Sequence, residues 1–93
     1  MKVYKFQFYQ KAKQEFIEEQ IAIAILAVES IFGAAKVRLN AGYLAVDNQV
    51  IIDVSHQIGE YIAQVFTGLM IRFIGETNFT VKRIENERRK EKA

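Results

Sequence analysis

Residues 44–55 read LAVDNQVIIDVS, and the predicted fold is built outward from this stretch. Its second half alternates apolar residues with others at a period of two, which is typical of a β-strand. Asp47 and Asn48 precede this half, and both residue types tolerate the left-handed backbone of a tight hairpin. We therefore predict two strands, over residues 35–46 and 49–55, that are joined by a short turn.

One helix is predicted on each side of this hairpin. Residues 11–32 carry apolar side chains three or four positions apart, which is helical spacing. Gly33 follows and is expected to end this helix. A second helix with the same spacing begins after Ser55, a residue type that caps helices, and ends at Gly75.

The outermost segments, residues 2–9 and 78–84, alternate like strands. The resulting order, βαββαβ, is that of the ferredoxin-like α+β sandwich. Right-handed crossovers then place the first and last strands side by side in a four-stranded antiparallel sheet, with two helices on one face. We expect residues 1–84 to form this single domain and residues 85–93 to form a charged C-terminal tail.

Three glycines interrupt the predicted elements. Gly42 predicts a bulge in the first hairpin strand, because the apolar alternation resumes out of phase after it. Gly59 and Gly68 lie inside the second helix, where each costs about 1 kcal/mol relative to alanine. We expect these two glycines to allow a close approach to the sheet or to another helix.

The composition excludes several classes of protein. The chain has 93 residues, 51% of them hydrophobic, which is enough for one core and too apolar for disorder. It has no cysteine, so disulfides, thiolate metal sites and cysteine nucleophiles are excluded. No apolar run approaches the about 20 residues that span a membrane, and no signal-peptide pattern is present. We therefore expect no membrane association and a cytoplasmic location.

Few side chains offer catalytic chemistry. His56 is the single histidine, and we interpret it as a polar residue in the first turn of the second helix. Asp53 falls on the expected open face of the sheet. A lysine on that face is expected to pair with it: Lys5, Lys36 or Lys82. No phosphate-binding glycine motif occurs. We therefore predict that the protein is not an enzyme and has no catalytic residues, bound metal or cofactor.

The charges are segregated along the chain. Residues 1–13 hold four bases and no acid, residues 14–81 hold three bases and eight acids, and residues 82–93 hold six bases and three acids. The basic ends meet if the first and last strands are neighbours. The candidate anion-binding residues on this basic edge are Lys2, Lys5, Lys82, Arg83, Arg88 and Arg89. The edge either binds nucleic acid or another anionic partner, or only deters edge-to-edge aggregation.

The first helix has more apolar surface than one sheet face can bury. Ile23, Ala27 and Ile31 recur at helical spacing outside the stripe that covers the sheet. Exposed apolar patches of this kind mark interfaces. We predict that these three residues carry a homo-oligomer, most simply a dimer.

These observations favour a small non-enzymatic protein that self-associates and acts as a binding or assembly module. One alternative is a nucleic-acid-binding regulatory protein that uses the basic edge and the open sheet face. Another is a sensor of a small ligand that binds at a subunit interface.

Overall fold

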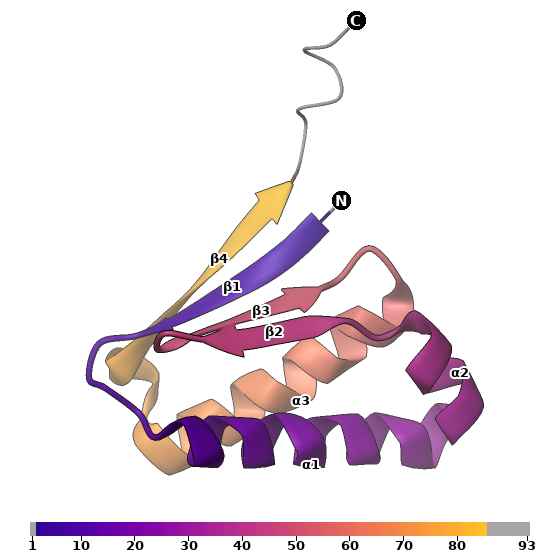
Figure 1. The fold of residues 1–93 in the computed structure, drawn as a ribbon, viewed down its shortest axis with the longest axis horizontal. Coiled ribbons are helices and arrows are strands. Elements are labelled where there is room, and N and C mark those ends of the chain that lie inside the picture. The colour runs from indigo at the N-terminus through magenta and orange to yellow at the C-terminus, as the bar shows by residue number, and fades with distance from the viewer. Residues whose placement is uncertain (1, 86–93) are drawn as a thin grey trace, which may run out of the picture.

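The computed structural model describes residues 2–85 of the chain. One layer is a four-stranded sheet, the other is formed by two long helices, and a short helix lies at one end (Figure 1). The elements in chain order are β1 (Lys2–Phe8), α1 (Gln14–Phe32), α2 (Ala34–Asn40), β2 (Tyr43–Val46), β3 (Gln49–Asp53), α3 (Gln57–Ile74), the 3₁₀ turn η1 (Glu76–Asn78) and β4 (Phe79–Glu85). The predicted mixed α+β class and four-stranded antiparallel sheet are therefore confirmed.

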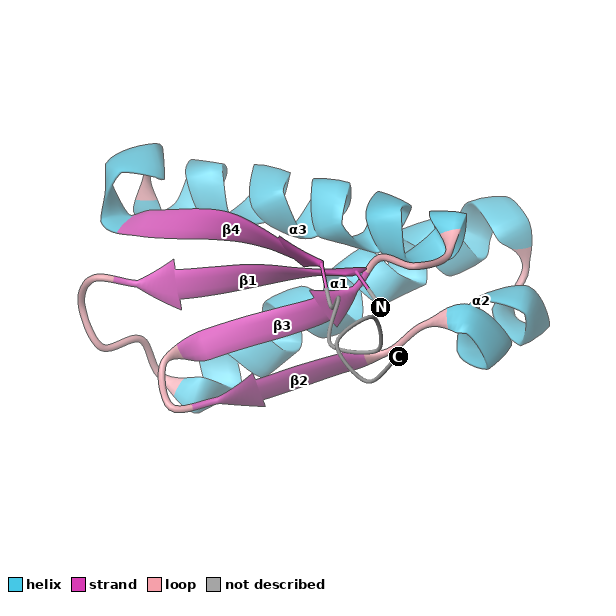
Figure 2. Cartoon of the chain, turned by 90° about the horizontal axis from the view of Figure 1, so that it is seen from above, coloured by secondary structure: helices cyan, strands magenta, loops and turns pink. Residues whose placement is uncertain are grey.

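The strands lie in the order β2-β3-β1-β4, and every neighbouring pair is antiparallel. The first and last strands are neighbours, as predicted, with Lys2 opposite Glu85 and Phe8 opposite Phe79. The helices α1 and α3 cover one face of the sheet and leave the other face open (Figure 2). Strand β4 includes Glu85, and the remainder of the predicted tail, residues 86–93, lies outside the described residues.

The β2–β3 hairpin forms as residues 44–55 predict. Asp47 and Asn48 have φ values of 50° and 64°, so both central residues of the turn adopt left-handed backbone. Val46 lies directly opposite Gln49, which makes this a two-residue turn. Positive φ at both central positions matches the twist of the flanking strands, and this sets the register of the hairpin.

The prediction of a strand from residue 35 onward is wrong, because Ala34–Asn40 form α2. Residues 2–85 thus contain three α-helices rather than two. Val37 is buried, whereas Leu39 is 83% exposed, so the alternation between them does not mark a buried strand face. Gly42 precedes β2 and makes no bulge; its carbonyl oxygen instead accepts a hydrogen bond from the Asp53 amide at 2.9 Å.

The core lies between the sheet and the two long helices. Phe6 of β1 is fully buried, and its ring meets that of Phe66 on α3 edge-on, with centroids 4.9 Å apart. Burying each large apolar side chain of this core contributes about 1.5–3 kcal/mol. The other fully or nearly fully buried large side chains are Ile17, Ile21, Val28, Val37, Val50, Ile52, Val54, Ile58, Ile62 and Met70.

Helix α3 begins in tight contact with the end of β3. A Cβ atom added at Gly59 would lie 1.9 Å from the carbonyl oxygen of Asp53, which is far inside any allowed contact. A Cβ atom at Gly68 would meet nothing within 4 Å. The expectation of a close approach to the sheet is thus met at Gly59, while Gly68 has no such role.

Candidate functional site

The outer face of α1 is apolar. Ile23 and Ile31 are 42% and 74% exposed, and Ala27 lies half-buried beside them. Leu26 is also exposed, at 62%, but it precedes Ile31 by five residues, which places it about 140° around the helix axis from Ile31. We call Ile23, Ala27 and Ile31 the outer α1 face; their place in an oligomer stays a prediction.

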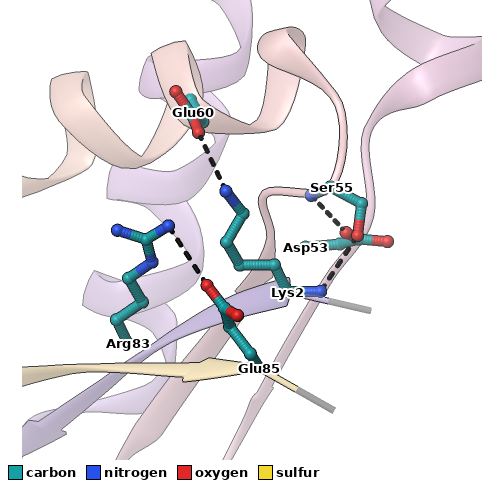
Figure 3. A network of polar contacts seen from close by, with 6 residues as sticks. All are labelled: Lys2, Asp53, Ser55, Glu60, Arg83 and Glu85. Carbon is teal, nitrogen blue, oxygen red and sulfur yellow. Dashed lines mark hydrogen bonds and ion pairs between the residues drawn. The ribbon is translucent and has the colours of Figure 1, made fainter. Parts of the chain in front are cut away.

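The four described residues of the predicted basic edge are divided between the two faces of the sheet. Side chains alternate between the two faces along a strand. Lys2 therefore lies on the same face as the buried Phe6, and Arg83 on the same face as the buried Phe79, which is the helix-covered face. Lys2 Nζ lies 3.8 Å from Glu60 Oε2, and Arg83 Nη2 lies 3.2 Å from Glu85 Oε2 (Figure 3). These two cations are therefore already paired with carboxylates. Two further members of the predicted edge lie outside the described residues: Arg88 and Arg89.

Lys5 and Lys82 lie on the open face, directly opposite one another on β1 and β4. Within residues 2–85, neither lysine has a carboxylate within ion-pair distance. The expected pairing of Asp53 with a lysine is wrong, because none of the ion pairs within residues 2–85 involves Asp53. Its Oδ1 instead accepts a hydrogen bond from the Ser55 amide at 2.8 Å (Figure 3). The carboxylate is thus used to shape the turn into α3, and like charges face each other on the sheet.

The turn into α3 also changes the roles expected for two polar residues. Ser55 was expected to cap the helix, but its Oγ accepts a hydrogen bond from the Lys2 amide at 3.1 Å. His56 is the N-cap instead, and its Nδ1 accepts from the Ile58 amide at 3.0 Å. The single histidine therefore has a structural role that satisfies one of the free amides at the start of α3.

A hollow of about 410 Å³ at the N-terminal end of α1 was not predicted from the sequence. Phe16 of α1 and Phe73 of α3 form its apolar wall, with ring centroids 6.4 Å apart and ring planes nearly perpendicular. Lys11 and Lys13 also line it. Its remaining lining residues are Gln10, Ala12, Ile74 and Asn78. We call it the Phe16–Phe73 hollow.

The hairpin turn holds the loop that forms this hollow. The Asn48 side chain donates through Nδ2 to the carbonyl oxygens of Phe8 and Gln10, at 2.8 and 3.2 Å. Its Oδ1 accepts from the Ala12 amide at 2.8 Å. A second hollow of about 390 Å³ lies beside the same loop, and Asp47 is among its lining residues. One turn residue thus fixes the backbone that carries both lysines.

Within residues 2–85, no three histidine or carboxylate side chains come together in a way that suits a metal ion. No helix in the same part of the chain has the length and hydrophobicity needed to cross a membrane. The chain matches no protein-family model, and no curated protein or solved structure is significantly similar to it. Its function must therefore be inferred from the surfaces described above.

Proposed function

We propose that this protein is a cytoplasmic, non-enzymatic assembly module that self-associates through the outer α1 face. The exposure of Ile23 and Ile31, at 42% and 74%, carries this proposal. Covering a Leu or Ile side chain gains about 1.5–3 kcal/mol relative to leaving it in water. Large apolar side chains gathered on one helix face therefore favour a partner.

A second copy of the chain fits this face because the face is self-complementary. Ile23 and Ile31 lie four residues before and after Ala27. If two α1 helices pair antiparallel about a two-fold axis at Ala27, Ile23 of one copy meets Ile31 of the other. The small alanine side chain at the crossing allows the helices to approach closely.

The charges at the two ends of the outer α1 face support the same antiparallel pairing. Glu19 stands before the face, and Lys36 follows it at the start of α2. Antiparallel pairing brings the acidic end of one copy toward the basic end of the other. Parallel pairing would instead place like charges together, so the charge pattern favours one orientation.

We also propose that the fold is a ferredoxin-like arrangement to which α2 has been added. The order β2-β3-β1-β4 supports this, because β3 lies between β1 and β2 and is antiparallel to both. Strands β1 and β2 are thus parallel and are joined across the sheet by α1. The additional helix α2 occupies the connection from α1 to β2.

Nucleic-acid binding through the open face is the second candidate, and it is favoured by Lys5 and Lys82, which have no carboxylate partner within residues 2–85. The carboxylates beside Lys2 and Arg83 weigh against it, since their negative charges offset those of the two cations. Within residues 2–85, Lys5 and Lys82 supply two of the six to ten phosphate contacts that strong binders make. Self-association is therefore the function that the surface supports best.

Sedimentation equilibrium tests self-association. The wild-type chain is expected to sediment as a dimer, and a variant with Ile23→Lys and Ile31→Lys is expected to sediment as a monomer. Ile71→Lys is the matched control, because Ile71 is an isoleucine on α3 with 44% exposure, against 42% for Ile23. Circular dichroism of each variant establishes that it is folded.

Three results would contradict the proposal. The first is a wild-type chain that stays monomeric throughout the concentration range. The second is a dimer that survives the paired α1 substitutions in the folded state. The third is loss of the dimer in the Ile71→Lys control, which would move the interface to α3.

A further inference from the structure

We propose that the Phe16–Phe73 hollow binds a small organic anion with an apolar body, such as a medium-chain carboxylate. The hollow lies at the N-terminal end of α1, whereas the outer α1 face is centred on Ala27. The inference therefore does not depend on self-association. It rests on the walls of the hollow, on its charges and on the way its loop is held.

The walls of the hollow suit the apolar part of such a ligand. Phe73 is 55% exposed, so a large part of its ring is open to a ligand. Together with Phe16 and Ile74 it offers two ring surfaces and an aliphatic surface to a ligand. The volume of about 410 Å³ falls within the about 300–1,000 Å³ that is usual for small-molecule sites.

The charges of the hollow favour an anionic head group. Lys11 and Lys13 both line it, and none of its described lining residues is acidic. Within residues 2–85, neither lysine lies within ion-pair distance of a carboxylate. A carboxylate or phosphate on the ligand would supply the missing negative charge and would accept hydrogen bonds from both ammonium groups. The hollow beside it is less suited, because Asp47 lines it.

The loop that carries the lysines is already fixed before a ligand arrives. Asn48 makes three hydrogen bonds to the backbone of residues 8–12. The Tyr9 amide also donates to the carbonyl oxygen of Asn78 at 3.0 Å, which joins the loop to the far side of the hollow. Because binding then orders little additional backbone, less of the interaction free energy is lost.

Titration followed by amide chemical shifts tests the inference with three probes: decanoate, decyl phosphate and decanol. Each is used below the concentration at which it forms micelles. Saturable shifts are expected for residues 10–16 and 73–78 with at least one anionic probe. Decanol, which has the same chain without the charge, is expected to bind about tenfold more weakly. The tighter of the two anions identifies the head-group class.

Two sets of variants separate the roles of charge and wall. Lys11→Ala with Lys13→Ala is expected to weaken binding of the anion about tenfold and to leave decanol binding unchanged. Both lysines are exposed, and Lys13 makes no side-chain cap to α1, so these changes leave the fold intact. Phe73→Ala is expected to weaken binding of all three probes. Lys36→Ala and Ile71→Ala are the matched controls, because neither residue lines the hollow.

The inference is overturned if neither anion gives saturable shifts, or if decanol binds as tightly as both anions. It is also overturned if the shifts cluster on residues 22–31, which would show that the ligand covers the outer α1 face instead. Loss of affinity in the Lys36→Ala control, equal to that of the paired lysine variant, would mean nonspecific attraction to positive charge. None of these results bears on the oligomeric state, which sedimentation measures separately.

Discussion

Gly59 in α3 shows how the absence of a side chain lets a helix approach a strand, and Gly68 in the same helix provides the comparison. Gly59 lies in the first turn, where the carbonyl oxygen of Asp53 would be 1.9 Å from an added Cβ atom. The contact involves backbone on both sides, so no side-chain rotation can relieve it. Gly68 lies in the middle of the same helix, where an added Cβ atom would meet nothing within 4 Å apart from the backbone of its own helix.

Alanine substitutions at these two positions are expected to act in opposite directions. Gly59→Ala should lower the free energy of unfolding by about 2 kcal/mol or more, because α3 must move away from β3. Gly68→Ala should raise it by about 1 kcal/mol, because alanine is the better helix former and meets nothing. Urea denaturation followed by circular dichroism measures both effects. A loss of stability at Gly68, or a gain at Gly59, would contradict this description of the helix.

The sequence marks both glycines as unusual but does not separate them. Helix propensity is local, so it assigns the same penalty to Gly59 and Gly68. What distinguishes them is the distance to Asp53, a residue that belongs to another element. The same limit applies to Ser55 and His56, since either residue type can cap a helix and the hydrogen bond from the Lys2 amide to Ser55 decides between them.

At the scale of elements, the prediction succeeded where a short stretch contains its own geometry. Asp47 and Asn48 specify the hairpin turn, and Gly33 ends α1 with φ 97°. The prediction failed at residues 34–40, where Val37 and Leu39 are only two apolar positions. Two apolar residues that are two positions apart fit a β-strand. They fit a helical turn equally well if the leucine is exposed. Only the packing of Val37 into the core selects the helix.

The register of the sheet makes a prediction about its open face. Lys5 and Lys82 are directly opposite, and like charges in this position destabilise a sheet. Lys82→Glu should therefore raise the free energy of unfolding by about 0.5–1 kcal/mol at low salt. The gain should shrink in 1 M salt, where the screening length falls to about 3 Å. Urea denaturation of both chains at the two salt concentrations checks this, and an equal gain at both would exclude a charge effect.

At the scale of the whole molecule, the sequence predicts which strands are neighbours more readily than it predicts how their charged side chains are arranged. Adjacent first and last strands follow from the order of elements, and the structure has them. Because side chains alternate along a strand, these cations are divided between the two faces of the sheet. On the covered face, Lys2 pairs with Glu60 and Arg83 pairs with Glu85. The Phe16–Phe73 hollow had no local signal, because its two rings come from helices that only the complete fold brings together.

The outer α1 face also has a consequence for the stability of the whole molecule. If two chains fold and pair together, unfolding separates them, so the unfolding equilibrium depends on protein concentration. Each tenfold increase in concentration should then stabilise the dimer by about 1.4 kcal/mol. A monomer has no such dependence.

Urea midpoints measured over a hundredfold range of concentration test this consequence. The wild-type midpoint should rise with concentration, as should that of Ile71→Lys, while the midpoint of the chain with Ile23→Lys and Ile31→Lys should stay constant. Both lysines in that variant replace exposed side chains, so the folded monomer should lose little beyond the pairing. A constant wild-type midpoint would mean that the chain folds without a partner, and the outer α1 face would then contribute nothing to its stability.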